Sequence, residues 1–415
     1  MKTLGLIGFG TSNRDAYNYF KDSYKITVHN PTKIDVPKDV SLIYGDRYLE
    51  CNEDIIFRSP AVKKWDIITD SPIYCESIYA LNNISSTKIC VTGSDGKTTT
   101  CSLIFNILNG KNAFLGGNIG TPILNAVNKG YDFIVGELSS FQLLNESVLV
   151  DTAVITNITE NHLDYHADMA EYIGAKENLL KNAKHIVLNY DDLILRNLGK
   201  RYKDLGRSVE FFSLKEKADA YLDSGYLYLK GIKLFHRDKI KLAGDFNISN
   251  ALAAILATYK HVSIDEICHG AISFNGVKNR LEFVRELKGI KFYNSSIDST
   301  PSRTIASLSA FDINRCIVIL GGRDKNLSYD ILENHLKNAK AIIVMGENRQ
   351  KILNAIANCS VKALLVNNMK EATSVAYSLA HIGDNVILSP ASTSFDMYES
   401  YVARGLDFIK HVNSL

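Results

Sequence analysis

Short apolar runs that alternate with helix-like segments constrain this fold more than any other feature of the sequence. Such runs span residues 4–8, 25–29, 89–92, 133–135, 152–156 and 185–188, and later ones span 316–322, 341–346 and 385–390. Strands that are apolar on both faces belong in parallel sheets covered by helices. The pattern therefore predicts an α/β protein with crossover helices, and a second doubly wound unit late in the chain.

A chain of 415 residues is too long to fold around one ordinary hydrophobic core, and we expect three domains. Residues 82–87 have the composition of a linker before a fresh strand, and residues 274–276 have that of another boundary. The predicted domains are a Rossmann-like domain over residues 1–86, a central ATP-binding domain of the P-loop type over 87–276, and a Rossmann-like, doubly wound domain over 277–415.

Charge and composition exclude several classes of partner. Lysine and arginine number 47 against 45 acidic residues, so no excess charge indicates nucleic acid or an anionic membrane. No run of about 18 uncharged apolar residues occurs, and the amino terminus lacks the apolar core of a signal peptide. The seven cysteines are widely spaced, unlike those of a zinc or redox site. We expect a cytoplasmic monomer without a nucleic-acid or membrane partner.

A glycine-rich segment follows one of the apolar runs. Residues 92–100 read Thr-Gly-Ser-Asp-Gly-Lys-Thr-Thr-Thr and open a helix-like stretch, so backbone N–H groups and the helix dipole can hold a polyphosphate. Lys97 is predicted to hold the outer phosphates and Thr98 to ligate Mg²⁺. Two residues separate Gly93 from Gly96, whereas the usual nucleotide loop has four between its glycines. A plain turn is therefore the alternative.

Three further segments, together with this short loop, resemble the motifs of one family. They read Gly-Asn-Ile-Gly-Thr-Pro at 117–122, Glu-Leu-Ser-Ser-Phe-Gln-Leu at 137–143, and Asn-Ile-Thr-Glu-Asn-His-Leu-Asp at 157–164. The chain resembles the Mur ligases, and the order of the motifs is that of the branch that adds D-glutamate. The resemblance implies ATP-dependent joining of D-glutamate to UDP-N-acetylmuramoyl-L-alanine in cytoplasmic peptidoglycan precursor synthesis.

The resemblance also implies sites for ATP and two Mg²⁺ ions. Glu137 follows a predicted strand, at the edge where α/β sheets place ligands, and a carboxylate suits Mg²⁺. The family implies one metal at Thr98 and Glu137 and a second at His162 and Lys176, although a lone histidine is more often structural. The residues implied to bind ATP are Gly93, Ser94, Asp95, Gly96, Lys97, Thr98, Thr99, Asn247, Asn250 and Arg280.

For Lys176, the local sequence context and the family resemblance lead to different expectations. By its own sequence context it is an exposed helical lysine, the commoner case for this residue type. The resemblance implies instead that it is carbamylated, which turns a cation into an oxygen donor for Mg²⁺. Lys97, Glu137, His162 and Lys176 are the catalytic residues that the resemblance implies.

The first domain is expected to bind the nucleotide sugar. Residues 8–13 read Gly-Phe-Gly-Thr-Ser-Asn after the first strand, and this is a weak phosphate signal because Asn13 replaces the third glycine. The resemblance implies that the loop holds the uridine diphosphate. The residues implied to contact the UDP-sugar substrate are Thr11, Ser12, Asn30, Ser59, Pro60, Asn118, Ser139 and Gln142.

The amino-acid site departs from the family in one place, because Ser295 and Ile297 stand where better-known members carry an aspartate and a lysine. We expect Arg303, with Lys325, to supply the missing charge for the two carboxylates of glutamate. The alternative is that both are solvated side chains. The residues predicted to bind the amino acid, from the resemblance or, for Arg303, from charge balance, are Ser299, Arg303, Lys325, Ser394, Phe395 and Tyr401.

The reaction implied is attack of the substrate carboxylate on the γ-phosphate of ATP, followed by attack of the amine on the acyl phosphate. Other functions stay open at this point. They are a Mur-like ligase with another amino acid, folylpolyglutamate synthetase, which lacks the first domain, and a P-loop ATPase whose hydrolysis drives a conformational change. The residues themselves leave the chirality of the amino acid open.

Overall fold

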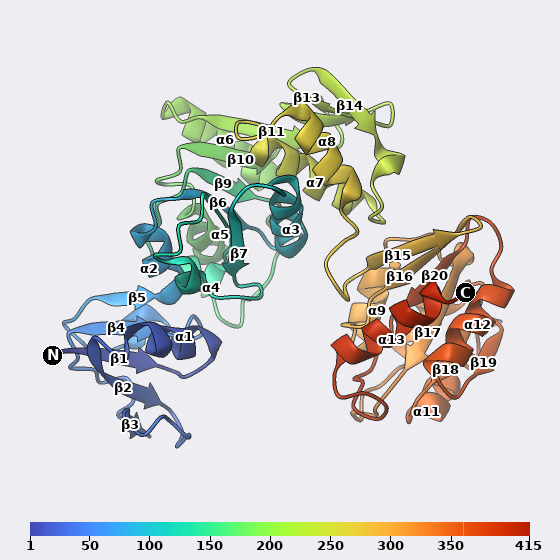
Figure 1. The fold of residues 1–415 in the computed structure, drawn as a ribbon, viewed down its shortest axis with the longest axis horizontal. Helices are drawn as coiled ribbons and strands as arrows, with labels where there is room; N and C mark the ends of the chain where they lie inside the picture. The colour runs from blue at the N-terminus through green and yellow to red at the C-terminus, as the bar shows by residue number, and fades with distance from the viewer. Residues whose placement is uncertain (360) are drawn as a thin grey trace. The chain divides into compact units, whose positions relative to one another are not determined.

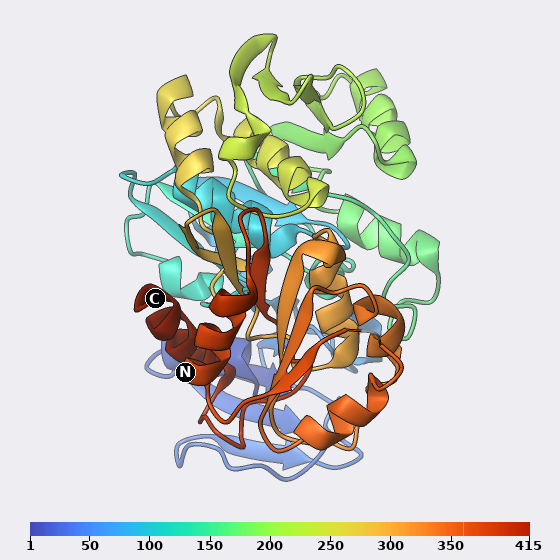
Figure 2. The same ribbon diagram turned by 90° about the vertical axis from the view of Figure 1, so that its right-hand side faces the viewer.

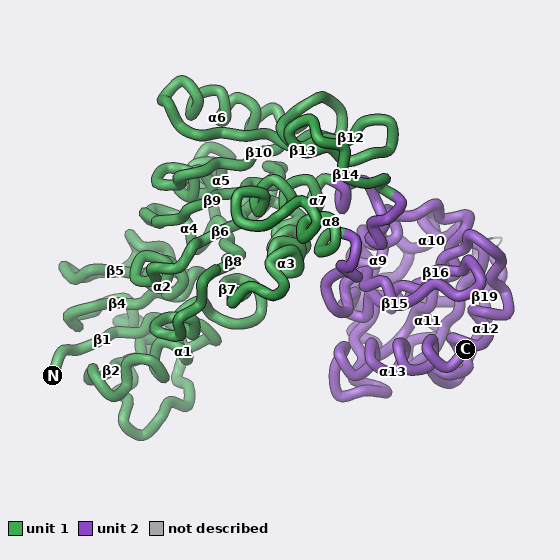
Figure 3. The backbone as a smooth tube through the Cα atoms, turned by 45° about the horizontal axis from the view of Figure 1, so that its top comes forward, with its two compact units in different colours: residues 1–237, 249–271 green, residues 238–248, 272–415 purple. Residues whose placement is uncertain are grey.

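The computed structural model describes residues 1–359 and 361–415, and these residues form three sheets with helices packed on them (Figure 1). They divide into two compact units (Figure 3). Unit 1 comprises residues 1–237 and 249–271, and unit 2 comprises residues 238–248 and 272–415. The predicted boundaries near residues 86 and 276 stay predictions.

The first sheet lies in unit 1 and has five parallel strands in the order β3-β2-β1-β4-β5. Its core contains an aromatic cluster in which the ring of Phe57 lies 5.4 Å from that of Phe20 and 5.1 Å from that of Tyr79, between centroids. The elements are β1 (Lys2–Ile7), α1 (Thr11–Phe20), β2 (Tyr24–Asn30), β3 (Ser41–Tyr44), β4 (Ile55–Arg58), η1 (Lys64–Asp66), β5 (Ile73–Cys75) and α2 (Glu76–Asn83).

The second sheet, also in unit 1, has nine strands in the order β14-β13-β12-β11-β10-β9-β6-β8-β7. The strands from β7 to β12 are parallel, as the apolar runs predict for β6, β8, β9 and β10, whereas β7, β11 and β12 were not among the predicted runs. They are β6 (Thr87–Thr92), β7 (Ala113–Gly117), β8 (Phe133–Glu137), β9 (Thr152–Ile155), β10 (His185–Asn189), β11 (Val209–Ser213), β12 (Ala220–Asp223), β13 (Tyr226–Leu229) and β14 (Ile232–His236).

The strands β12, β13 and β14 pair antiparallel, which the apolar runs did not predict. The turn between β12 and β13 is built on Ser224 and Gly225, and the turn between β13 and β14 on Lys230 and Gly231, all with positive φ. Two-residue turns of this conformation match the twist of a hairpin. The two glycines were therefore the available signal, but the strands they join are only four or five residues long.

Helices cover the second sheet. The most buried is α7, in which every residue from Ala251 to Ala257 is at most 2% exposed. The run of alanine, isoleucine and leucine explains this, because a helix that is apolar on all sides fits only in a core. The helices and turns are α3 (Lys97–Ile107), η2 (Ile123–Ala126), α4 (Ser140–Leu143), α5 (Met169–Glu177), α6 (Leu193–Asp204), η3 (Arg237–Lys239), α7 (Asp245–Thr258) and α8 (Ile264–Ser273).

Unit 2 contains the third sheet, with the strand order β15-β16-β20-β17-β18-β19, in which β15 alone is antiparallel to its neighbour. Helices pack on both faces, as Figures 1 and 2 show. The elements are β15 (Glu282–Leu287), β16 (Ile290–Asn294), α9 (Pro301–Leu308), η4 (Ile313–Arg315), β17 (Cys316–Gly321), α10 (Ile331–Leu336), β18 (Ala341–Met345), α11 (Arg349–Ala355), β19 (Ala363–Leu365), α12 (Met369–Leu379), β20 (Asn385–Leu388) and α13 (Tyr401–Asn413).

No helix among the described residues has the length and apolar character that crossing a bilayer requires.

A buried carboxyl group joins the first two sheets within unit 1. Glu76, the first residue of α2, is 1% exposed. Its Oε1 accepts a 2.6 Å hydrogen bond from the backbone N–H of Leu124 in η2, and its Oε2 accepts one of 2.7 Å from Ser77 Oγ. Ser77 Oγ in turn accepts from Gln142 Nε2 at 3.0 Å. Burial raises the pKa of Glu76 to about 7.

This raised pKa makes stability depend on pH. Between the ordinary value of 4.5 and about 7, the folded protein keeps a proton on Glu76 that the unfolded chain has released, so the free energy of unfolding should fall as the pH rises through this range. Glu76→Gln stays neutral and keeps an acceptor oxygen. It should remove up to about 3 kcal/mol of this pH dependence.

The effect is measured by urea unfolding of the wild type and the variant at about pH 5 and about pH 8. The change in the free energy of unfolding between the two pH values is then compared between the two proteins. The variant should gain stability relative to the wild type at the higher pH. An equal change with pH in both proteins would show that Glu76 keeps its ordinary pKa.

Candidate active site

The glycine-rich segment connects β6 to α3, and α3 begins at Lys97, as the sequence predicts. Gly93 has a φ of 149°, and a Cβ atom there would overlap Thr156 Oγ1. Gly96 has a φ of 78°, and a Cβ atom there would overlap Asn250 Oδ1. Both positions thus require glycine, for conformation and for space. The loop brings its backbone close to residues after β9 and in α7.

Glu137 lies at the centre of the site. It ends β8, is 2% exposed, and sits in register with Val91 of β6 and Gly117 of β7. Its Oε2 accepts a 2.8 Å hydrogen bond from Thr98 Oγ1, and its Oε1 accepts one of 3.2 Å from Asn118 Nδ2. Three motifs that are distant in sequence therefore meet at one carboxylate, at the carboxyl edge of a parallel sheet.

Two lysines converge on the phosphate loop. Lys97 Nζ donates to the carbonyl oxygens of Gly93 at 2.9 Å and Ser94 at 2.8 Å. Lys176 Nζ, from α5, donates to the same Gly93 oxygen at 2.7 Å. The two predicted catalytic lysines thus share one acceptor, the carbonyl oxygen of Gly93.

Lys176 is 1% exposed, so the expectation of an exposed helical lysine from its own sequence context is wrong. The physical reason is that α5 packs this face against the phosphate loop, where the Gly93 carbonyl satisfies the amine. Tyr172 supports it, with its ring centroid 4.5 Å from Lys176 Nζ. Burial and the nearby Lys97 lower the pKa of Lys176 to about 7, although Asp95 acts in the opposite direction.

The segment after β9 holds the phosphate loop from the other side. Ser94 Oγ donates to the carbonyl oxygen of Thr159 at 3.0 Å and lies 2.9 Å from the hydroxyl of Tyr172. The N–H of Asp95 donates to Asn157 Oδ1 at 2.9 Å. The Asn-Ile-Thr motif at 157–159 therefore shapes the loop through hydrogen bonds, a role that its spacing did not reveal.

His162 is exposed and has a φ of 57°, in the left-handed region. Its ring lies 4.9 Å from that of Phe141 and 6.5 Å from that of Tyr172, between centroids. His166, which the sequence analysis missed, is 2% exposed; its Nε2 lies 2.9 Å from Ser140 Oγ and its Nδ1 lies 3.2 Å from Glu171 Oε2. Burial lowers the pKa of His166. The motif at residues 157–164 contains His162 but ends before His166, so no sequence signal pointed to His166.

In the first sheet, Thr11 is exposed and Ser12 is half-buried at the start of α1, and Asn30 donates to the carbonyl oxygen of Thr32. Asn13, at the place of the missing third glycine, is buried. Its Nδ2 donates to the carbonyl oxygens at residues 7 and 8, at 2.9 and 2.8 Å. This amide fixes the turn after β1, so the substitution has a structural explanation.

The Ser59–Pro60 turn is held between the two sheets of unit 1. The N–H of Ser59 donates to the carbonyl oxygen of Ile7 at 2.8 Å, and the carbonyl oxygen of Pro60 accepts from the hydroxyl of Tyr165 at 3.0 Å. Ser139 caps α4 in a reciprocal capping box with Gln142. These predicted nucleotide-sugar residues thus lie on elements with fixed positions in unit 1.

The predicted adenine residues are divided between the units. In unit 1, Asn250 is 5% exposed, accepts from Thr100 Oγ1 at 3.3 Å and lies against Gly96. In unit 2, Asn247 donates to the carbonyl oxygen of Ala243 at 2.6 Å, and Arg280 is exposed. Asn250 is therefore part of the wall of the phosphate loop.

The predicted amino-acid residues lie in unit 2. Ser299 is half-buried in the loop before α9, Arg303 and Lys325 are exposed, and Ser394 is 1% exposed, with no partner for its hydroxyl among the described residues. Phe395 and Tyr401 are 58% and 42% exposed. The exposed ones are accessible to a ligand.

The segment that departs from the family has a buried carboxyl of its own. Asp298 is 4% exposed and accepts a 2.8 Å hydrogen bond from Ser389 Oγ, while Ser295 Oγ accepts from the N–H of Leu281 at 3.2 Å. Burial raises the pKa of Asp298, opposed by the serine hydroxyls and by Arg303. A carboxyl group thus remains in this segment although position 295 carries serine.

Comparison with known proteins identifies the family. The sequence matches the Mur ligase middle domain over residues 91–258 and the Mur ligase glutamate ligase domain over residues 279–392. A UDP-N-acetylmuramoylalanine–D-glutamate ligase of Clostridium kluyveri is 37% identical, and the alignment covers 100% of this chain and 97% of that protein. One of Clostridium perfringens is 36% identical with the same coverage.

The chain belongs to the Mur ligase family. Solved structures agree with its fold. The UDP-N-acetylmuramate-alanine ligase of Thermotoga maritima aligns with a TM-score of 0.58 at 18% identity over 100% of both chains. The MurF ligase of the same organism, solved in complex with ADP, aligns with a TM-score of 0.56 at 18% identity over 99% of this chain and 94% of that one. The α/β fold class predicted from the sequence is confirmed, and the roles of individual site residues in this Mur ligase stay predictions.

Lys97→Ala tests the phosphate loop. Because the side chain is half-buried at the start of α3, with its amine on the carbonyl oxygens of the loop, its loss should leave the fold intact but reduce ligation at least about a hundredfold, through lost charge stabilisation at the phosphoryl oxygens. Rates of ADP release measure this, with circular dichroism as the check on folding.

Lys129→Ala is the matched control, because Lys129 is exposed in the loop before β8, at the opposite edge of the sheet. It should behave as the wild type. Activity of the Lys97 variant within about tenfold of the wild type would remove Lys97 from the phosphate site.

Proposed function

We propose that this Mur ligase joins D-glutamate to UDP-N-acetylmuramoyl-L-alanine with ATP, through an acyl phosphate, in peptidoglycan precursor synthesis. The observation that carries the proposal is the position of Glu137, which contacts Thr98 of the phosphate loop and Asn118 of the Gly-Asn-Ile-Gly-Thr-Pro motif. The substrate pair is supported by relatives of that name at 36–37% identity over the whole chain.

The first metal site would be formed by Thr98 and Glu137. Mg²⁺ prefers hard oxygen ligands, and the hydroxyl and carboxylate oxygens of these residues lie 2.8 Å apart at the start of α3, so the donor set fits. When bound, Mg²⁺ neutralises charge on the phosphate oxygens of ATP. The carboxylate is buried, so its orientation is set before the nucleotide arrives.

The second site would use His162 and a modified Lys176. As an ammonium group, Lys176 cannot ligate a cation. With the pKa of Lys176 lowered to about 7, a substantial fraction of the amine is neutral at neutral pH. A neutral amine adds CO₂, forming an N–C bond and releasing one proton, and the resulting carbamate supplies oxygen donors. The 2.7 Å contact with the Gly93 oxygen places this group beside the phosphate loop.

The protein's own residues hold the substrates in position and neutralise the negative charge of the phosphates and carboxylates. Lys97 faces the phosphoryl oxygens of ATP, and the N–H groups at the start of α3 orient them. The substrate carboxylate attacks the γ-phosphorus and the bond to ADP breaks. The amine then attacks the acyl carbon and a C–N bond forms. The acyl C–O bond breaks, phosphate leaves with that oxygen, and the amine releases a proton. Arg303 and Lys325 would hold carboxylates of the amino acid. We propose that the reaction takes place in the cytoplasm and that the protein is a monomer.

Substrate dependence distinguishes this function from its rivals. ADP release should require both UDP-N-acetylmuramoyl-L-alanine and an amino acid, with D-glutamate preferred to L-glutamate. A Mur-like ligase of other specificity would respond to a different amino acid, and a folylpolyglutamate synthetase to a folate. ATP turnover with neither co-substrate would instead indicate a P-loop ATPase, and would contradict the proposal.

Lys176→Ala tests the carbamate. The variant should be nearly inactive, and added acetate or another short carboxylate should restore part of the rate, because a free carboxylate can occupy the space of the carbamate. The control is Lys181→Ala, since Lys181 is exposed shortly after α5. Normal turnover of the Lys176 variant without added carboxylate would show that the lysine is not modified for catalysis.

A further inference from the structure

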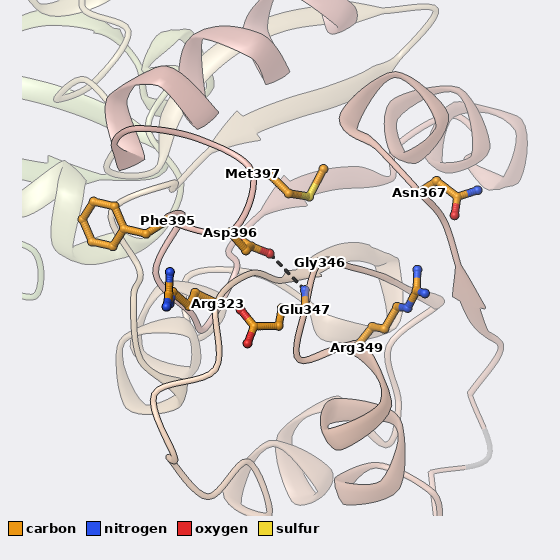
Figure 4. Close-up of a pocket in the computed structure, with 8 residues that line it drawn as sticks. All are labelled: Arg323, Gly346, Glu347, Arg349, Asn367, Phe395, Asp396 and Met397. Carbon is orange, nitrogen blue, oxygen red and sulfur yellow. Dashed lines mark hydrogen bonds between the residues drawn. The ribbon is translucent and has the colours of Figure 1, made fainter.

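A cavity of about 560 Å³ in unit 2 has charged side chains of both signs in its lining (Figure 4). Arg323 and Arg349 lie on opposite sides of it and point apart. Asp396 Oδ2 accepts from the N–H of Glu347 at 3.0 Å, as the dashed line shows, so this carboxylate holds a loop. The two guanidinium groups therefore do not face one ligand. A convergent set of polar groups lies in unit 1, around Arg58.

Arg58 ends β4 and is 1% exposed, although arginine is seldom buried without partners. Its Nη1 donates to the carbonyl oxygen of Val62 at 3.1 Å. Its Nη2 lies 3.3 Å from the carbonyl oxygen of Phe141 and 3.4 Å from that of Leu144. The same nitrogen lies 3.1 Å from Glu146 Oε1, so its two N–H groups are shared among three acceptors. One guanidinium group thus contacts four acceptors from two parts of the chain.

The contact with Val62 holds the turn that follows β4. The N–H of Val62 donates to the carbonyl oxygen of Ser59 at 3.0 Å, which closes this turn. Ser59 and Pro60 are expected to contact the nucleotide sugar. Because Arg58 directly precedes them and its side chain returns to the carbonyl oxygen at the end of the turn, the guanidinium group fixes the shape of this part of the predicted substrate site.

The contacts with Phe141 and Leu144 hold α4 from the other side. The last carbonyl oxygens of a helix have no donor within the helix, and α4 has only four residues, so these two carbonyl groups need donors from elsewhere. Ser139, which caps α4, and Gln142 within it are also expected to contact the nucleotide sugar. Arg58 therefore joins the two groups of predicted substrate residues, one on each of the first two sheets.

We propose that Arg58 is a positioning residue for the nucleotide-sugar substrate, which holds the Ser59–Pro60 turn of the first sheet against α4 of the second. The inference rests on the proposed function. Residues on two sheets can bind one molecule only at a fixed separation, and a displacement of about 1 Å can cost about a hundredfold in rate. A planar guanidinium group suits this role because its donors point in fixed directions, whereas an ammonium group is a compact point charge.

The ion pair with Glu146 allows this role to be separated from stabilisation of the fold. The Glu146 side chain is 6% exposed, and Lys64 Nζ lies 3.9 Å from its second oxygen. Glu146 follows α4 and is not among the residues expected to contact the substrate. Loss of the ion pair should therefore lower stability, whereas loss of the contacts with the carbonyl oxygens should displace the substrate residues.

The test uses the full chain with Arg58→Lys, and Arg315→Lys as the control. Arg315 also donates to a carbonyl oxygen, that of Ile382 at 2.9 Å, and pairs with Asp384, but it lies at the amino end of β17 in unit 2. Arg58→Lys should raise the KM for UDP-N-acetylmuramoyl-L-alanine about tenfold or more. The KM for ATP should change less than about twofold and kcat less than about threefold. The control should match the wild type.

Glu146→Gln supplies the second comparison, because it removes the ion pair and leaves the guanidinium group on the carbonyl oxygens. It should lower the urea midpoint while changing the KM for the UDP-sugar substrate less than about threefold. Should Arg58→Lys fail to fold, Arg58→Met combined with Glu146→Leu takes its place, since replacing both partners leaves no buried charge unpaired. The same rise in the KM for the UDP-sugar substrate is expected.

An unchanged KM for the UDP-sugar substrate in the Arg58 variant, with a lower urea midpoint, would show that Arg58 only stabilises the fold. This result overturns the inference and leaves the proposed function standing. Equal rises in the KM values for ATP and for the UDP-sugar substrate overturn it too, because the whole centre would then be disturbed. A wild type that does not ligate D-glutamate to the UDP-sugar substrate contradicts the proposed function itself, before any variant is compared.

Discussion

A buried carboxylate at the end of a central strand must find hydrogen-bond donors, and the active centre is built around this requirement. Glu137 is 2% exposed, and a carboxylate removed from water without donors costs several kcal/mol. Its donors come from the start of α3, which follows β6, and from the loop after β7, because register places Val91 and Gly117 of these neighbouring strands opposite Glu137. The parallel sheet, the glycine-rich loop and the Gly-Asn motif thus depend on one another.

The parts of the fold that could be predicted are those with a signal in the local sequence. Most of the buried parallel strands were found because each is a continuous apolar run, but β4 and β11, which are also buried and parallel, were not among the predicted runs. The antiparallel hairpins were missed because their strands are short and their alternation is weak, as in β13 and β14. The start of α3 was predictable because Gly96 and Lys97 carry the signal locally.

Contacts between distant segments left no local signal. Lys176 looks like a surface lysine in its own helix, and only the approach of the phosphate loop to α5 reveals that it is buried against the Gly93 carbonyl. Asn348 carries no local signal either, although its Oδ1 accepts from the N–H of Gly322 and its Nδ2 donates to Ser392 Oγ, so that it joins three loops of unit 2. Arg404 is a third case, 1% exposed, donating to carbonyl oxygens of Gly321, Ser296 and Ser392, with its pKa lowered to about 10 by burial. Pairings of this kind follow from the topology and cannot be read along the chain.

The central claim is that the phosphate loop and Glu137 serve transfer of the γ-phosphoryl group to a carboxylate. The most direct measurement uses UDP-N-acetylmuramoyl-L-alanine labelled with ¹⁸O in its carboxylate, with ATP, D-glutamate and the wild-type protein. The account predicts that each inorganic phosphate released carries one oxygen from that carboxylate, because the C–O bond of the acyl phosphate breaks when the amide forms. Phosphate without the label, formed while the amide accumulates, would contradict it.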